Sequence, residues 1–416
     1  MSSKRRRGFT LLEVLVGLSI SLIVIGMVTA IFLGQQRTFQ SLDVNRVASE
    51  AARDAFLEIE PALRRAGFGL DPRHAFDFTN YACPARPCRD SATGPDTIVF
   101  YARNPTYQLV GAGGTNPDGT SCATVGGCTY GNAFHVVATG SNTATVTLPA
   151  GTVLHKGRIV QFMCPNAKNS TMGTVATTVS GEGDQAIPLV AMVVADPTKQ
   201  NDFNQNACFS GVNSGVVMFL VDRYHYLVEN YGGTPWLVLD QGLDLDGDGV
   251  LPENGADRDD YLPLAQGVED VQFAYVLNVN APAVSGGGTA AAPGPGPDLP
   301  SPAGGPNQGN WVVGDFPGQV EEPDPSVTKM PLYATSIADP LRFNNSAANI
   351  RGVRVSLSLR SLLTDQSKPS SWSGDVERQM ENRSTATLLS GGRFRRFSFQ
   401  TVVNTRDMES RNSFLF

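Results

Sequence analysis

An apolar run over residues 9–33, with a single carboxylate near its start, constrains this 416-residue chain more than any other feature. Four basic residues, at positions 4–7, come directly before it. The run is long enough to cross a bilayer as one helix, and the positive-inside rule puts its basic end in the cytoplasm and all later residues outside. A carboxylate such as Glu13 is costly in apolar surroundings, so its presence needs a functional reason.

Two ordinary kinds of N-terminus leave parts of this pattern unexplained. A secretory signal has a shorter apolar stretch followed by a small-residue cleavage site, and no such site follows this run. A plain membrane anchor accounts for the basic residues and for the length. It accounts neither for the junction of Gly8 with Phe9 nor for Glu13.

The segment from the basic residues through Gly-Phe-Thr-Leu-Leu-Glu at positions 8–13 resembles the type IV prepilin family. The resemblance implies that a membrane-bound prepilin peptidase cuts after Gly8 and methylates the new N-terminus, Phe9. Glu13 then lies roughly 6 Å, about one helical turn, from the Phe9 amine. In a fibre Glu13 is expected to pair with the cationic N-terminus of a neighbouring subunit, which offsets the desolvation of both charges.

The helix is expected to continue beyond the membrane as an amphipathic spine. Its apolar residues recur at spacings of three and four: Phe39, Leu42, Ala48, Ala51, Ala52, Ala55, Ile59 and Leu63. Pro61 is expected to interrupt this helix, and Gly67 with Gly69 to end it. The predicted organisation is therefore a leader at 1–8, a transmembrane helix at 9–33 and the periplasmic half of the spine helix at 34–67.

The rest of the chain, residues 68–416, is predicted to be a β-rich periplasmic body, so the fold class is α+β with the spine helix packed on that body. Short stretches with a period of two are separated by turn residues, as over 271–277 and 397–403. Over 353–360, Val and Leu alternate with Arg and Ser, which predicts a sheet with one solvated face.

Two polar segments interrupt the strand pattern. Residues 281–310 are rich in Gly, Pro and Ala and too poor in apolar side chains to bury a core, so a flexible loop is expected there. Residues 368–382 form a second polar loop. Because strands are expected on both sides of each loop, we prefer one elaborated body to two domains.

Further stretches along the chain resemble the PilW group of minor pilins. They cover residues 63–68, 223–228 with 236–239, 264–275 and 396–407. The resemblance implies a subunit that assembles with other minor pilins, helps to start the fibre at its tip and can present a large adhesin there. The cysteine-bearing middle of the chain and the Gly/Pro-rich loop carry no such resemblance.

An acidic loop is the second notable motif. Asp244, Asp246 and Asp248 occupy alternate positions, and Gly249 is the sixth residue, as at the start of an EF-hand-type calcium loop. The carbonyl of Val250 would be the next ligand. The alternative is a solvated turn held by Asx-type hydrogen bonds. Three like charges this close repel without a cation, which favours calcium in a structural role.

The end of this loop departs from the EF-hand pattern. Its twelfth position is Gly255, where an EF-hand has Glu. The completing ligand stays open among four acidic residues: Glu253, Asp257, Asp259 and Asp260.

Six cysteines lie in the part of the chain expected outside the cytoplasm, where disulfides form: Cys83, Cys88, Cys122, Cys128, Cys164 and Cys208. Cys83 with Cys88 and Cys122 with Cys128 are close enough in sequence to close small loops, which leaves Cys164 with Cys208. This is a local pairing among fifteen connectivities. Zinc is the competing use, but neither a C-x-x-C pair nor a nearby histidine pair occurs.

Composition and motifs argue against other classes of protein. The net charge of −7 becomes more negative once the basic leader is removed, so general nucleic-acid binding is not expected. The four histidines are scattered, and the common hydrolase, zinc-protease and phosphate-loop motifs are absent from the sequence. No enzymatic activity is therefore predicted. Arginines near the C-terminus suit a solvated strand face or an acidic neighbour better than DNA.

The sequence as a whole predicts a minor pilin of a type IV pilus, anchored in the inner membrane before assembly and then carried on the cell surface. Its expected partners are the prepilin peptidase, the inner-membrane assembly platform, other minor pilins, the major pilin and a tip adhesin. Two alternatives stay open: a tip pseudopilin of a type II secretion system, and a calcium-dependent surface subunit for adhesion or DNA binding.

Overall fold

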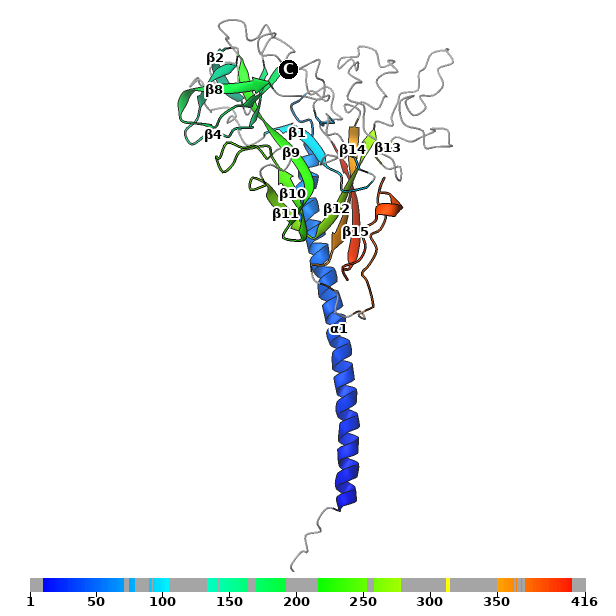
Figure 1. Ribbon diagram of the computed structural model, residues 1–416. Coiled ribbons are helices and arrows are strands. Elements are labelled where there is room, and N and C mark those ends of the chain that lie inside the picture. Colours follow the sequence, from blue (N-terminus) through cyan, green and yellow to red (C-terminus); the bar gives the residue numbers. More distant parts are fainter. Residues whose placement is uncertain are drawn as a thin grey trace, which may run out of the picture.

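One long helix carries a strand-rich body on its C-terminal half in the computed structural model (Figure 1). This arrangement confirms the predicted α+β class with a helix packed on a β-rich body. The six cysteines and the Gly/Pro-rich loop at 281–310 lie outside the described residues. Those residues are 10–70, 75–78, 90–91, 93–104, 133–140, 142–163, 170–191, 216–252, 258–277, 312–314, 350–362, 364, 368 and 371–405.

Helix α1 spans Leu11–Arg64, 54 residues, and is about 80 Å long. The prediction that Pro61 interrupts it was wrong, because the helix continues through Pro61 to Arg64. The carbonyl of Leu57 loses its partner at this proline, but Leu57 is exposed and water can satisfy that carbonyl. The helix then ends at a turn stabilised by the Arg65 N–H, which donates to the carbonyls of Ala62 and Leu63.

The body covers only the C-terminal half of α1. The residues buried on this half are mostly small, so the strands can approach the helix closely: Ala48, Ala52, Ala55, Ile59, Ala62 and Leu63. Towards its N-terminus the helix projects away from the body (Figure 1). Its apolar side chains there are exposed in the isolated chain.

Among the described residues, nine antiparallel strands form the larger sheet. They are β1 (Ile98–Arg103), β2 (Ala133–Thr139), β3 (Thr143–Leu148), β5 (Ile159–Met163), β6 (Ser170–Val175), β8 (Gly183–Ala191), β9 (Val217–Tyr231), β10 (Thr234–Asp240) and β11 (Leu262–Gln266). A short ribbon of β4 (Val153–Leu154) and β7 (Val179–Ser180) stands beside them.

Strand β9 belongs to two layers of this sheet. Its first part pairs with both β2 and β5, so β9, β2, β3, β8, β6 and β5 close into a ring with its own apolar core. Its second part lies between β1 and β10, and these strands pack on α1 in the main core. The ring is therefore continuous through β9 with the layer that holds the helix.

The smaller sheet has the order β13 (Val312–Val313), β12 (Val268–Leu277), β14 (Ile350–Arg360) and β15 (Arg396–Asn404). Val271, Phe273 and Tyr275 of β12 lie opposite the apolar residues of β14 and pack into the main core with α1. The two sheets thus enclose the C-terminal half of the helix from different sides (Figure 1).

The other face of the smaller sheet is covered over β12 and β14, which corrects the prediction of a solvated face over 353–360, whereas Gln400, Val402 and Asn404 of β15 are exposed on that face. Asp270 and Gln272 of β12 lie opposite Ser358 and Ser356 of β14, and all four are buried. Residues 371–395, called the strap from here on, contact this face and include the short 3-10 helix η7 (Thr385–Thr387). Residues 93–97 contact it too. The strap is a polar coil without hydrophobic periodicity, so the sequence pattern did not predict that it covers the sheet.

Candidate functional site

The N-terminal end of α1 is fixed by Thr10 and Glu13. The Glu13 N–H donates to the Thr10 hydroxyl over 3.3 Å, and the Thr10 N–H donates to the Glu13 carboxylate over 2.9 Å. This reciprocal pair is a capping box. In the isolated chain, the carboxylate of Glu13 therefore sits at the helix start and is exposed. Gly8 and Phe9 lie outside the described residues.

The first part of α1 exposes an apolar surface on all sides. Every residue over 11–33 is exposed, and the helix is long and apolar enough to cross a membrane. A surface of this size and composition is not stable in water. It requires an apolar environment such as lipid.

The acidic loop brings its three predicted aspartates together. Carboxylate oxygens of Asp244, Asp246 and Asp248 lie within 4.8 Å of one another. Asp244 is buried, and its two oxygens accept the N–H groups of Gly247 (2.7 Å) and Gly249 (3.0 Å). Glycine is required at both positions, since their φ angles are 83° and 84°.

Two neighbouring segments hold the acidic loop in place. Asp260 is buried, and its Oδ1 accepts the N–H groups of Leu245 (2.9 Å) and Asp246 (3.2 Å). On the other side, the Asp244 N–H donates to the Lys156 carbonyl over 3.1 Å. The His155 Nδ1 atom lies 3.0 Å from the Asp244 carbonyl oxygen. The loop thus connects the strands near α1 with the turn that follows β4.

This donor set fits a hard cation in part. Asp246 and Asp248 are exposed, and each uses one carboxylate oxygen to accept an N–H two residues ahead. The remaining oxygens are open to a cation from solvent. Asp260 clamps the loop backbone, a role that the sequence did not specify. Val250 is exposed next to the aspartates, whereas the candidate ligands Glu253 and Asp257 lie outside the described residues.

His225 belongs to a buried polar cluster on β9 and β10. Its Nδ1 lies 2.8 Å from Asp240 Oδ2, and an Arg223 nitrogen lies 3.4 Å from the same carboxylate. Burial alone would raise the pKa of Asp240, but Arg223, His225 and the Gly242 N–H together lower it to about 2. All three side chains are nearly inaccessible, so the cluster is part of the interior.

One contact that sequence reasoning missed joins the end of α1 to the sheet. Arg65 Nη2 donates to the Tyr224 hydroxyl over 2.7 Å, and its guanidinium lies 5.6 Å from the centre of the Tyr224 ring. The Tyr226 hydroxyl reaches the Glu58 carbonyl over 3.4 Å. Two of the stretches with PilW resemblance, 63–68 and 223–228, therefore meet in space. The resemblance that these two stretches share was the sequence feature that could have indicated this contact.

The basic residues near the C-terminus are partly neutralised by neighbours. Arg396 makes two hydrogen bonds to the Glu269 carboxylate, at 2.7 and 3.2 Å. Arg360 lies 3.5 Å from the same carboxylate, and its guanidinium stacks 4.4 Å from the Phe394 ring centre. These arginines serve the contact between β12, β15 and the strap.

Residues 3–29 match the family model described as the prokaryotic N-terminal methylation motif. The match covers the junction of Gly8 with Phe9, the capping box at Thr10 and Glu13, and the first part of α1. No curated protein and no solved structure gives a significant match to the chain.

Proposed function

This chain is a type IV prepilin-like protein with a membrane-anchoring helix, and from that premise we propose that it acts as a minor pilin of a type IV pilus. In this role it primes assembly together with other minor pilins and occupies a place at or near the tip. The observation that carries the proposal is the exposed apolar half of α1, which has Glu13 in its first turn and bears the methylation motif.

The two environments of α1 explain its two halves. Before assembly, lipid surrounds the apolar half in the inner membrane, with the body on the periplasmic side. In the fibre, apolar helices of other subunits replace the lipid. The C-terminal half stays bound to its own body through Ala52, Ala55 and Ile59 and leaves a charged side exposed for neighbours.

Glu13 is the proposed assembly residue. Its carboxylate is bound to Thr10 in the isolated chain, and a single helix offers no cation beside it among the described residues. Cleavage after Gly8 creates a methylated ammonium on Phe9. Within an apolar fibre interior, a neighbour's ammonium stabilises the carboxylate, because a buried charge is tolerated when it is paired.

The place of the PilW-like stretches supports a minor pilin within this proposal. The stretch at 264–275 supplies most of β12 and part of β11, and the stretch at 396–407 supplies all of β15. The stretches at 63–68 and 223–228 supply the contact of Arg65 with Tyr224. All of them lie around the C-terminal half of α1, so they form the surface against which the spine helix packs.

The alternative with a specific observation behind it is a type II secretion pseudopilin, since the methylation motif is shared by both systems. Deletion of the gene distinguishes the two. We expect loss of surface pili and of twitching motility with protein secretion intact. Loss of secretion with normal piliation would establish the pseudopilin role and refute the pilus role.

We also propose that the acidic loop binds calcium as a structural ion. Asp244, Asp246, Asp248 and the Val250 carbonyl would supply ligands, and Glu253 or Asp257 would complete the set. The proximity of the three carboxylates within 4.8 Å supports this assignment. The ion would order the connection between β10 and β11, and no catalytic role is proposed.

A further inference from the structure

Ion pairs and hydrogen bonds attach the strap to the smaller sheet. The sheet face beneath it presents Asp270, Gln272, Ser356 and Ser358, all buried. Near the tip of the strap, Glu381 binds Arg354 through both carboxylate oxygens and accepts a hydrogen bond from Ser356 at 2.6 Å. Polar contacts of this kind bind in one geometry and change with protonation, unlike apolar packing.

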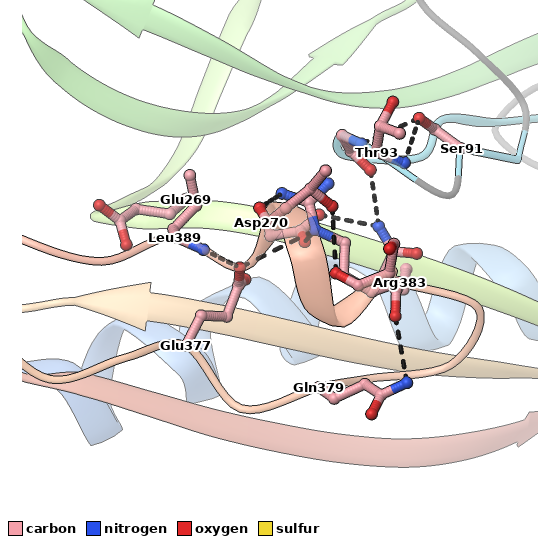
Figure 2. Close-up of polar contacts among 12 residues, drawn as sticks. Ser91, Thr93, Glu269, Asp270, Glu377, Gln379, Arg383 and Leu389 are labelled. Atoms are coloured by element: carbon pink, nitrogen blue, oxygen red, sulfur yellow. Dashed lines mark hydrogen bonds and ion pairs between the residues drawn. The ribbon is translucent and has the colours of Figure 1, made fainter. Parts of the chain in front are cut away.

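Arg383 reaches from the strap into the centre of this interface (Figure 2). It is 2% exposed, and its Nε lies 3.3 Å from Asp270 of β12 and 3.9 Å from Glu377 of the strap itself. Both carboxyl groups are buried, and among the described residues the ion-pair partner of each is Arg383. A buried negative charge without a partner is costly, so the pair holds one proton and carries one negative charge opposite one guanidinium.

The surroundings of this pair add negative charge. Asp96 is fully buried, and its carboxylate accepts the N–H groups of Ser91 (2.6 Å) and Phe273 (2.9 Å). Asp90 is buried too and accepts a hydrogen bond from Asn382 in the strap at 2.5 Å. Residues 90–97 thus contribute two carboxyl groups, the strap one carboxyl and one guanidinium, and β12 one carboxyl.

A bound cation does not resolve this excess of carboxyl groups. Within the part of the chain that the structure describes, the cluster with metal-ligand spacing is the one at Asp244. Protonation of carboxyl groups lowers the negative charge instead. Burial and the nearby Glu377 raise the pKa of Asp270 to about 8, against the effect of Arg383. Burial and the neighbouring Asp90 hold the pKa of Asp96 well above its usual range.

The backbone of the strap is strained where it enters the interface. Glu381 has a φ of 42°, in the left-handed region that side chains other than glycine rarely adopt. Strain of this kind persists only where the contacts around it enforce it. Release of the contacts would therefore favour movement of the strap away from the sheet.

We propose that the strap is a proton-dependent latch: Asp270 and Glu377 share one proton beneath Arg383 when the strap is closed, and loss of that proton to solvent opens it. The inference is independent of the pilus role and of calcium. It predicts a closed strap in acid and an increasingly open strap towards alkaline pH.

The expected pH dependence follows from the proton count. When the strap is open, Asp270 of β12 faces solvent and titrates near pH 4, as in a model peptide. Between about pH 4 and pH 8 the closed strap holds one proton more than the open strap, so the ratio of open to closed molecules rises about tenfold per pH unit. Above about pH 8 both forms have lost the proton, and the ratio levels off.

Hydrogen–deuterium exchange on the full-length chain in detergent micelles, from pH 5 to pH 9, tests the latch. Protection factors are corrected for chemical exchange, and peptides of β9 and β10 serve as the internal reference. We expect the protection of amides at Glu377, Arg383 and Leu389 to fall about tenfold per pH unit up to about pH 8, with flat reference peptides. A flat strap profile in the wild-type chain would overturn the proposal without any variant.

Two variants separate the latch from simple loosening. Asp270→Asn keeps the shape and can donate to Glu377 without a titrating proton, so its strap protection should not depend on pH. Glu377→Gln removes the same shared proton, so its strap protection should also not depend on pH. This second variant tests the proposal if Asp270→Asn folds poorly. The matched control, Glu381→Gln, weakens the contact with Arg354 at the tip of the strap. It should lower the protection of the strap amides by the same factor at every pH. An unchanged slope in a folded Asp270→Asn or Glu377→Gln chain would refute the shared proton.

Discussion

The Tyr224 hydroxyl of β9 accepts a 2.7 Å hydrogen bond from Arg65, the first residue after α1, and so attaches the end of the spine helix to the sheet. Burial raises the pKa of Tyr224 to about 12, so the hydroxyl keeps its proton at physiological pH. The same ring stacks on Phe100 of β1 at 5.0 Å. Any force along the helix is therefore transmitted to two strands of the body.

This contact can be measured by a double-mutant cycle. Arg65→Ala is expected to lower the free energy of unfolding of the detergent-solubilised chain by about 2 kcal/mol and Tyr224→Phe by about 1 kcal/mol, since hydrogen bonds to charged groups contribute 1.5–3 kcal/mol. The two losses should be less than additive by about 1 kcal/mol. Arg53→Ala, at an exposed position of the same helix, is the control and should change little. Strict additivity would mean that the two side chains are not coupled.

Substitution of Glu13 tests the assembly mechanism. Glu13→Ala should leave leader cleavage and body folding intact but reduce incorporation into fibres at least tenfold, because an unpaired ammonium would remain buried in the fibre. Immunoblots of sheared pili against whole-cell protein give the ratio. N-terminal mass spectrometry shows processing.

Thr10→Val is the matched control for Glu13. It removes the hydroxyl that accepts the Glu13 N–H but keeps the carboxylate. If Glu13 acts between subunits, Thr10→Val chains should assemble nearly normally. Equal defects in the two variants would show that Glu13 serves its own helix as a cap, and the assembly role would be lost.

Calcium binding should raise the stability of the body. At a concentration one hundred times the dissociation constant, bound calcium stabilises by about 2.7 kcal/mol, which is visible as a higher melting temperature. Asp244→Asn and Asp248→Asn should each raise the dissociation constant for calcium at least tenfold. Asp184→Asn, an exposed carboxylate on β8, is the control. A melting temperature that is the same in millimolar calcium and in chelator would refute the site.

Asp240 should make the body sensitive to acid. Its pKa of about 2 lies below that of an unfolded aspartate, so its stabilising contribution is complete above about pH 4 and is lost as the pH falls through 2. The loss amounts to about 2 kcal/mol. Denaturant unfolding at pH 7, 4 and 2.5 measures it.

Asp240→Asn should remove this acid dependence and destabilise the body at neutral pH by about 3–5 kcal/mol, because buried Arg223 loses this carboxylate. Asp184→Asn again provides the exposed comparison. A neutral effect of Asp240→Asn would show that the cluster adds little to stability.

The helix and the acidic loop were readable from the sequence because both depend on neighbours in the chain. A continuous apolar run implies a helix regardless of tertiary context, and Thr10 with Glu13 caps it locally. The turn at Asp244 is formed locally, by glycines at 247 and 249 whose N–H groups donate to the Asp244 carboxylate. Strand β6, by contrast, is rich in Thr, Ser and Gly and shows no alternating pattern, since its pairing with β5 and β8 decides its conformation.

By itself, the sequence determined that the chain has a membrane-anchoring helix with a prepilin-like start and a β-rich body, because hydrophobicity and spacing act over short distances along the chain. Only the tertiary structure decided that β9 closes a ring, that Arg65 meets Tyr224 and that Arg383 lies between Asp270 and Glu377. These contacts join residues far apart in sequence, and the polar groups in them look solvated until the folded chain removes them from water.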